Sequence, residues 1–310
     1  MAVAATYGQG ILPANLEYDV NSAYAMVEKI ARQVIRNVQT TDHLAVFDKM
    51  PIDKGTTIEE AVIKLVEAQA RATGSTVVNK IDTSNLLAVR YFKDWTQTQF
   101  KTSVSIDEIR KVVLADGNVE AIAERVVDTL VQSDKQDKYE KVKGLFKYGV
   151  GNSTAQPAIE ATFVDINEGT PIDCSAEGGY KKLLKVLKNT VSGMKFVNTD
   201  FNTAGIKRGT LASDIYIVMP YKIKNALDVD ELAGVFNLSK TELEARIIEI
   251  DEGDNIYVVD QNAILDYTRL YEMTSFWNAE GLYTNYWLTT ERLYALSPLF
   301  DGCYISCTKY

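Results

Sequence analysis

Hydrophobic positions recur along this chain with two different periods, and aromatic residues concentrate towards its C-terminal end. The last 44 residues, 267–310, hold 11 of the 30 aromatic side chains. Within them, β-branched and aromatic residues dominate 282–290, which predicts a strand, and a second extended run, 292–296, follows almost at once. Large rings fall on both faces of these strands, so each face is expected to meet an apolar surface of the same subunit or of a neighbouring copy.

Apolar positions that recur every three or four residues predict the helices. The clearest helix is 180–194, where the lysines fall mostly off the apolar stripe. A long helix that starts near residue 118 is expected to kink or break near Ser133, because the apolar stripe changes phase there. Further helical segments are predicted over 24–35, 105–116 and 223–236.

Residues 46–104 are predicted to form a helix-tipped hairpin or loop. A turn-rich run leads into a predicted helix over 58–72, where Thr57 and Glu60 have the spacing of a capping box. Residues 76–104 then return as extended chain, because β-branched and aromatic side chains dominate there.

The remaining segments mix strands with helices, which predicts an α+β fold. The predicted strands of this part are 215–219, 247–250 and 256–259. The acidic run 251–254 lacks the spacing of a calcium-binding loop, so a hairpin turn is expected there. Glycine and proline punctuate 149–178, and this segment is expected to contain a domain boundary.

Length and composition narrow the class of protein. At 310 residues the chain exceeds the size at which one core usually stops growing, which favours two packed units. The 46% apolar and 24% charged residues are typical of a folded globular protein. No membrane association is predicted, because no window approaches the ~18 consecutive apolar residues of a membrane-spanning helix. The N-terminus lacks the basic start of a secretory signal, so the protein is expected to stay where it is made.

The net charge of −9 argues against a broad nucleic-acid-binding face, because phosphate binding depends on Lys and Arg. It is compatible with a protein that encloses nucleic acid without gripping it.

Few residues offer catalytic, cofactor-binding or metal-ligating chemistry. The phosphate-cradling glycine-rich motif is absent, and 149–151 lacks the third glycine of a dinucleotide-binding loop. The single histidine, His43, is expected to face solvent or to hydrogen-bond locally. Cys174, Cys303 and Cys307 are an odd set, and they are expected to be buried thiols. The sequence therefore predicts no catalytic residue, no cofactor, no metal site and no enzymatic activity.

Four runs carry a resemblance to a known family. They are FNTAGI (201–206), SDIYIVMP (213–220), NAEGLYTNYW (278–287) and YALSP (294–298). Together they resemble the major capsid proteins of short-tailed bacteriophages, which adopt the Hong Kong 97-type shell fold. The likeness is most specific over 196–305 and only architectural for the first 150 residues.

This resemblance implies a division of the chain into five segments. They are an N-terminal arm (1–45), an extended loop (46–104), a peripheral domain with a spine helix (105–179), an axial domain (180–266), and strands that return to the long sheet of the peripheral domain (267–310). A shell subunit buries its edges against several neighbours, which would account for the aromatic excess.

The function implied is structural. Copies of the chain would assemble as pentamers and hexamers in the host bacterial cytoplasm into the icosahedral head of a virion, enclosing double-stranded DNA without reading its sequence. A portal is expected, and a separate scaffolding protein is expected because no highly charged helical extension precedes the arm. From apolar spacing, the candidate contacts with neighbouring copies are Pro51, Ile58, Val62 and Leu65 of the loop, and Tyr283, Tyr286 and Trp287 of the C-terminal strands.

Two alternatives remain open at this point. The first is an encapsulin-like shell of the same fold that carries protein cargo, which genomic neighbours would distinguish from a phage head. The second is a carboxylate or metal-dependent hydrolase with its site in 149–179, which would need a well-formed pocket with convergent carboxylates.

Overall fold

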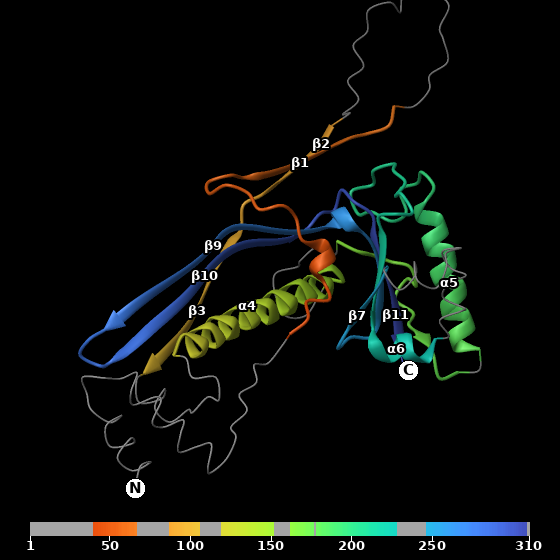
Figure 1. Cartoon of the computed structure of the whole chain (residues 1–310). Coiled ribbons are helices and arrows are strands. Elements are labelled where there is room, and N and C mark those ends of the chain that lie inside the picture. Colours follow the sequence, from red (N-terminus) through yellow and green to blue (C-terminus); the bar gives the residue numbers. More distant parts are fainter. Residues whose placement is uncertain are drawn as a thin grey trace, which may run out of the picture. The chain divides into compact units, whose positions relative to one another are not determined.

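The computed structural model describes residues 40–66, 87–105, 119–151, 162–176, 178–227 and 246–308 (Figure 1). These residues fall into two compact units, each built from separate stretches of the chain. The first unit contains the described parts of Met1–Asp42, Gln97–Lys138 and Arg269–Glu291, and the second contains those of His43–Thr96, Tyr139–Thr268 and Arg292–Tyr310. The chain therefore enters each unit more than once. This division by proximity does not test the five-segment division, which stays a prediction.

A six-stranded sheet forms the centre of the second unit. Its strands in spatial order are β4 (Val164–Asp165), β11 (Gly302–Thr308), β8 (Asn255–Asp260), β6 (Ile215–Pro220) and β7 (Ile247–Ile250), and β5 (Ile172–Asp173) also pairs with β11. The sheet is mixed: β8 is antiparallel to both of its neighbours, whereas β6 and β7 are parallel. Strands distant in sequence thus lie side by side, with the C-terminal strand β11 inside the sheet rather than at its edge.

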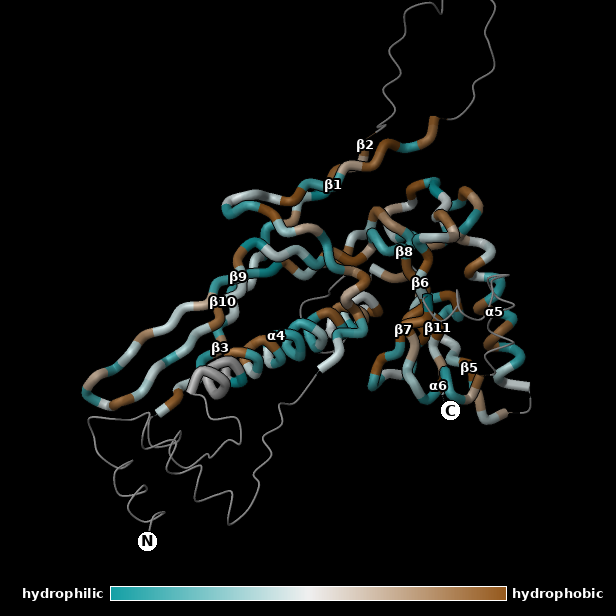
Figure 2. Tube along the Cα trace, in the orientation of Figure 1, coloured by the Kyte–Doolittle hydropathy of each residue, from teal (hydrophilic) through white to brown (hydrophobic). Residues whose placement is uncertain are grey.

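Both faces of this sheet are buried. Along β6, Ile217 packs into one apolar cluster and its neighbour Val218 packs into another. Val258 and Val259 repeat the alternation on β8. Because successive residues of a strand point to opposite faces, one continuous apolar run contributes to two cores at once. Figure 2 shows this hydrophobic character along β6, β7 and β11.

Helix α5 (Gly179–Met194) confirms the helix predicted over 180–194, and it covers one face of the sheet (Figure 1). Leu183, Leu187 and Val191 of its apolar stripe are fully buried in the first cluster. The opposite side of the helix is polar, so the stripe alone sets which side faces the sheet.

Aromatic rings cover the other face of the sheet. Phe146 from the C-terminal part of helix α4 (Val119–Gly149) lies 5.1 Å from the ring of Tyr257 on β8. Phe47 of the short helix η1 (Ala45–Phe47) lies 6.0 Å from Phe146 and is fully buried. Ring pairs at such distances add to the energy of apolar burial.

A buried polar network anchors the loop that follows α5 to the end of the chain. The Arg208 guanidinium donates to Asp260 at 2.9 Å and lies 4.2 Å from the ring centroid of Phe300. The Thr210 hydroxyl donates to Asp301 at 2.7 Å, and the Asn202 amide donates to the same carboxylate at 3.1 Å. Burial raises the pKa of Asp260, and Arg208 opposes this shift. The loop of the FNTAGI run is therefore held by charge pairing as well as by packing.

The first unit contains most of a three-stranded sheet and the N-terminal part of α4. The strands in spatial order are β3 (Trp95–Ser105), β10 (Tyr283–Leu296) and β9 (Ile264–Asn278). Residues 282–296, predicted as two strands, form the single long strand β10 from Tyr283 onwards. Along the first residues of β9, its other side meets the segment after η1: the Lys49 N–H donates to the Asp266 carbonyl at 2.9 Å, and the Ile52 N–H donates to the Thr268 carbonyl at 3.0 Å. Beyond Thr268 no further strand pairs with this side of β9 among the described residues, which makes it an edge of the sheet.

The predicted helix over 58–72 is wrong for its first part. Residues Ile58–Ile63 form strand β1, which pairs with strand β2 (Leu87–Phe92) in an antiparallel ribbon. Thr57 and Glu60 have the spacing of a helix cap, but the β-branched residues of β1 instead find cross-strand partners more than twenty positions away in the sequence. Residues 67–72 lie outside the described residues.

Of the kink or break predicted near Ser133, the break is wrong, because α4 is continuous from Val119 to Gly149. The polar interval is not a helix end, since its members have partners of their own. Lys138 is nearly buried and pairs with Asp42 at 3.3 Å. The Ser133 hydroxyl donates to the Thr129 carbonyl within the helix at 2.8 Å.

Of the remaining predictions for secondary structure, some are confirmed, some are corrected, and some lie outside the described residues. The strands at 215–219, 247–250 and 256–259 are confirmed as β6, β7 and β8. The acidic run 251–254 is a turn but not a hairpin, because β6 lies between β7 and β8 in the sheet. Helix α6 (Tyr221–Ala226) covers only the beginning of the predicted 223–236 segment. The segments 24–35, 106–116 and 228–236 lie outside the described residues.

Shortening a side chain in the apolar stripe of α5 should lower the stability of the second unit. We expect Leu187→Ala to lower the free energy of unfolding by about 2–5 kcal/mol, because the side chain is fully buried against the sheet. Asn189→Ala, on the exposed side of the same helix, should change it by less than about 0.5 kcal/mol. Urea unfolding followed by circular dichroism compares the two, and equal effects would contradict the packing described for α5.

Candidate subunit-contact surfaces

One face of the β1–β2 ribbon is apolar and exposed. The register pairs Ile63 with Leu87 and Ala61 with Val89, which puts these side chains on one face together with Tyr91. Ile63 is 77% exposed and Tyr91 is 58% exposed. We call Ile63, Leu87, Val89 and Tyr91 the ribbon surface.

The opposite face of the ribbon is anchored in the subunit at one end. Ile58 and its cross-strand partner Phe92 are buried against Leu265 and Leu293. The other end of the ribbon has no such cover among the described residues. A two-stranded ribbon is only marginally stable in water, so the ribbon surface needs a further apolar partner.

The four loop residues predicted as contacts occupy different positions. Ile58 is 8% exposed and belongs to the core of the subunit, so its side chain is already covered. Val62 is half-buried, whereas Pro51 and Leu65 are exposed. The spacing of Ile58, Val62 and Leu65 predicts one stripe of a helix, and that stripe does not exist because Ile58–Ile63 form a strand. Their role in contacts between copies stays a prediction.

The sequence reasoning missed the ribbon surface itself. The signal was present in the alternation of Leu87, Val89 and Tyr91 with intervening residues. It could not be interpreted without knowing which distant strand pairs with it.

A second apolar surface lies at the far end of β9 in the first unit. We call its residues the strand-end surface. They are Tyr271, Met273, Phe276, Trp277 and Leu282, which are between 37% and 60% exposed. In strand geometry Tyr271, Met273 and Trp277 share one side and Phe276 points to the other, so both sides of this edge strand carry rings. Exposed apolar groups of this density on a strand at the edge of a sheet are typical of a binding surface.

The three C-terminal residues predicted as contacts lie on β10, beside this surface in sequence. Tyr283, Tyr286 and Trp287 are each half-buried. The Tyr283 hydroxyl accepts from Asn278 at 2.8 Å, and Lys101 of β3 lies 5.6 Å from the ring centroid of Trp287. These rings therefore have some partners within the subunit, while the more exposed rings are on β9. Their role in contacts between copies also stays a prediction.

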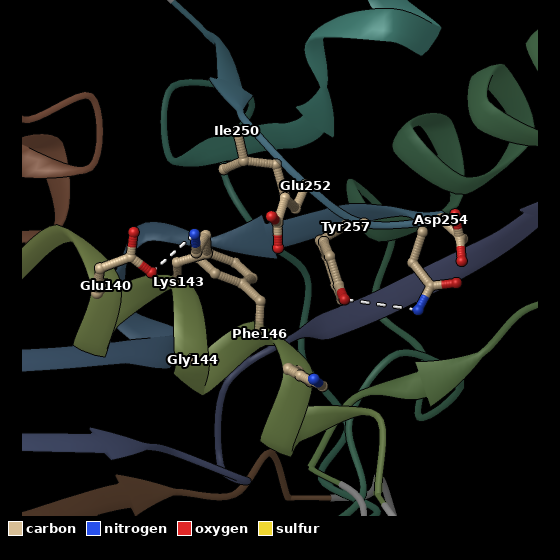
Figure 3. A pocket seen from close by; sticks show the side chains of 11 residues that line it. Glu140, Lys143, Gly144, Phe146, Ile250, Glu252, Asp254 and Tyr257 are labelled. Carbon is tan, nitrogen blue, oxygen red and sulfur yellow. Dashed lines mark hydrogen bonds and ion pairs between the residues drawn. The ribbon is translucent and has the colours of Figure 1, made fainter.

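The second unit contains a cleft of about 550 Å³ between α4 and the acidic turn that follows β7 (Figure 3). Glu140, Lys143 and Lys147 of α4 line one side, and Glu252 and Asp254 of the turn line the other. The cleft thus contains both signs of charge.

One lysine ties the two sides of this cleft together. Lys143 donates to Glu140 at 2.7 Å and to Asp251 at 3.0 Å. Asp251 also accepts from the Tyr139 hydroxyl at 2.8 Å. Burial lowers the pKa of Lys143, but its hydrogen bonds to Glu140 and Asp251 outweigh burial and hold it above the usual value.

The pKa values of Asp251 and Tyr139, which are joined by a hydrogen bond, are shifted in the directions that the network requires. Burial raises the pKa of Asp251, but hydrogen bonds from Tyr139 and Lys143 outweigh burial and lower it overall. Burial, and then the hydrogen bond to Asp251, raise the pKa of Tyr139 to about 12. The network therefore joins α4 to the turn with a carboxylate, an ammonium and a neutral phenol.

The cleft does not match the site required by the hydrolase alternative. That site was expected in 149–179, whereas the cleft is lined by α4 and by 250–257. Of the carboxylates that line it, Glu140 is paired with the ammonium group of Lys143. Within the described residues no group of three or more His, Cys, Asp and Glu side chains is arranged to hold a metal ion. Residues 152–161 lie outside the described residues.

The single histidine and the three cysteines lie as their sequence context predicts. His43 is exposed, and its ring lies 6.5 Å from that of Tyr139 in an edge-on arrangement. Cys174, Cys303 and Cys307 are buried free thiols, which confirms the prediction. Burial raises the pKa of the Cys303 thiol.

Comparison with known proteins gives a consistent result. The family model described as Phi29-like phage major capsid protein matches residues 8–306. The chain is 24% identical over 291 residues to the major capsid protein of Bacillus phage PZA, covering 91% of this chain and 62% of that protein. It is 22% identical over 293 residues to the major capsid protein of Streptococcus phage Cp-1, covering 90% and 80%. The chain thus spans less than two thirds of the length of the PZA protein.

Solved structures show the same fold at low identity. A chain of the capsid structure of Staphylococcus phage Andhra superposes with a TM-score of 0.69 at 12% identity, covering 91% of this chain and 88% of that one. A chain of the capsid structure of cyanophage P-SCSP1u superposes with a TM-score of 0.56 at 11% identity, covering 90% and 91%. Among the described residues, no helix has the length and apolar character that a membrane crossing requires.

Removing the Tyr139 hydroxyl should weaken the joint between α4 and the turn in a pH-dependent way. We expect Tyr139→Phe to lower the free energy of unfolding by about 1 kcal/mol at neutral pH, since the ring is kept and Asp251 is half exposed. The pKa of Tyr139 is raised in the folded state, so its contribution is present below pH ~10 and is lost as the pH rises to about 12. The difference between parent and variant should shrink over this range.

Urea unfolding of both proteins between neutral pH and pH ~12 measures this difference. Tyr148→Phe, at an exposed tyrosine of the same helix, is the matched control and should show no such trend. A constant difference across the range would contradict the role of the hydroxyl.

Proposed function

The chain belongs to the Phi29-like phage major capsid protein family, and on this premise we propose that its copies assemble into the shell of a phage head around double-stranded DNA. The observation that carries this proposal is the family match over residues 8–306, nearly the whole chain. The fold shared with chains of solved phage capsids supports it. The subunit acts in this proposal as a structural part of the virion and not as an enzyme.

We further propose the five-segment layout of the Hong Kong 97-type fold for this subunit. Its support is partial: α4 has the length of a spine helix, and the six-stranded sheet with α5 has the mixed α+β character of an axial domain. The β1–β2 ribbon would belong to the extended loop, and β9 with β10 to the long sheet of the peripheral domain. The N-terminal arm falls almost entirely outside the described residues.

The exposed apolar surfaces support assembly on energetic grounds. Full burial of one large apolar side chain contributes about 1.5–3 kcal/mol, so each surface offers several kcal/mol per copy. Association costs roughly 4–15 kcal/mol in lost translational and rotational freedom. A subunit in a closed shell has several neighbours at once, and the sum over its edges exceeds what one contact achieves.

The partners of this proposed shell follow from the same premise. Pentamers and hexamers of the chain would close the head in the host bacterial cytoplasm, with a separate scaffolding protein and a portal. The enclosed DNA would not be read in sequence. Neither the encapsulin-like shell nor the hydrolase is favoured by a specific observation.

The sharpest test compares the two ends of the ribbon. We expect Ile63→Ser with Leu87→Ser to leave the unfolding free energy within about 1 kcal/mol of the parent, because both side chains are exposed. The same variant should lose most of its ability to form uniform particles with a co-expressed candidate scaffold, as judged by electron microscopy.

The matched control is the cross-strand pair at the anchored end. Ile58→Ala with Phe92→Ala should destabilise the subunit by several kcal/mol, since both side chains are buried in it. Particles of normal yield and size from the Ile63/Leu87 variant would refute the ribbon surface as a contact between copies.

The strand-end surface has its own fluorescence test. Trp277 is 47% exposed, so iodide should quench it in the free subunit and quench it less in assembled particles. Trp277→Phe should remove most of the change in quenching between the two states, leaving the contributions of Trp95 and Trp287. If quenching of the parent does not differ between subunits and particles, this surface stays open to solvent and is not a contact.

A further inference from the structure

Helix α5 presents a strongly basic face on a chain of net charge −9. Lys181, Lys182, Lys185 and Lys188 are all exposed. The helix contains no acidic residue along its 16 positions. This is unlike α4, where lysines alternate with aspartates and glutamates.

The lysines lie on the side of α5 that faces away from the sheet. At ~100° per residue, Lys181, Lys185 and Lys188 fall within about 60° of one another, opposite Leu183 and Leu187 of the buried stripe. Within the described part of the chain none of these lysines forms an ion pair with an acidic side chain. Their charge is therefore not neutralised by any acidic side chain that the structure describes.

This arrangement lowers the stability of the isolated helix. Like charges at positions four apart, such as Lys181 and Lys185, destabilise a helix by about 0.2–0.5 kcal/mol. Lys181 and Lys182 also lie in the first turn, where the helix dipole is positive and basic residues are unfavourable. The residue before the helix, Gly178, provides no side-chain cap. A solvated surface would be satisfied by mixed charges, so the uniform sign indicates an anionic partner.

We propose that the basic face of α5 contacts the phosphate backbone of the DNA enclosed by the shell, without reading bases. This inference rests on the proposed function. The three aligned lysines span about 10.5 Å of helix. Over that length one DNA strand presents about three phosphates. Lysines are flexible point charges, which suits contacts that do not depend on sequence.

DNA fits this face better than a second copy of the chain does. The backbone of DNA carries an unbroken row of negative charges, whereas acidic residues on elements such as α4 are interrupted by lysines. Each contact between a lysine and a phosphate is weak in this arrangement. Many copies of the chain make such contacts at once, so their total binding energy is appreciable. The acidic remainder of the chain repels DNA and limits the contact to this face.

The test measures binding of a short fluorescent DNA duplex to the unassembled full-length chain by anisotropy over a range of salt concentrations. The test variant replaces Lys181, Lys182, Lys185 and Lys188 with Gln. We expect it to bind at least about tenfold more weakly at low salt, and to reduce the slope of log affinity against log salt by about 3 to 4. It should be no less stable than the parent, because Gln is a good helix former and the repulsion is removed.

Two matched variants distinguish the effect of the basic face of α5 from the effect of the net charge of the chain. Replacing the exposed Lys54, Lys93, Lys135 and Lys222 with Gln removes the same four charges from separate elements and should leave the salt slope nearly unchanged. Replacing the four α5 lysines with Arg should retain the slope. Equal loss of slope in both Gln variants, or no loss in either, overturns the proposal.

Electron microscopy of particles distinguishes this inference from the proposed function. Parent and α5 variant should both form particles with a co-expressed scaffold. If the α5 variant binds DNA like the parent but no longer assembles, the face belongs to a contact between copies and the proposal is wrong. If the parent itself forms no particles, the shell function fails, whatever the DNA-binding result.

Discussion

Every strand of this protein has two faces, and covering those faces is the constraint on which the rest of the structure depends. In the six-stranded sheet the constraint is met within one unit. Leu187 of α5 packs on one face of the sheet, and Phe146 of α4 packs on the other. Strands β6 and β8 contribute alternate side chains to both clusters. The position of each helix follows from the need to cover one face.

The same constraint is not met within the subunit at two other places. Ile63 and Tyr91 of the ribbon, and Tyr271 and Trp277 of β9, occupy strand positions equivalent to buried ones, yet they face solvent in a single copy. A subunit of a shell leaves them for neighbours, because its edges become interior only on assembly.

Charged groups hold the loops and turns whose positions apolar packing alone would not fix. Arg208 holds Asp260 and lies over Phe300, which joins the loop after α5 to the C-terminal strand. Lys143 joins α4 to the turn after β7 through Asp251. Buried or half-buried pairs of this kind add little net stability, but a broken one is costly, so they favour one arrangement over others. On the exposed side of α5, by contrast, the charges have one sign and no internal partner among the described residues.

The sequence by itself determined the elements whose pattern is complete within a short window. Helix α5 follows from one apolar stripe, β6 and β8 follow from continuous apolar runs, and the buried thiols follow from the usual burial of free cysteine. Tertiary structure alone decided that residues 58–63 are a strand, because their partners 87–92 supply the backbone hydrogen bonds that a local helix would otherwise form. It also kept α4 continuous through its polar interval, since Lys138 finds Asp42 far away in the sequence. Local periodicity records what each residue prefers to bury, whereas pairing with a distant segment supplies the partner, and no short window of sequence contains that partner.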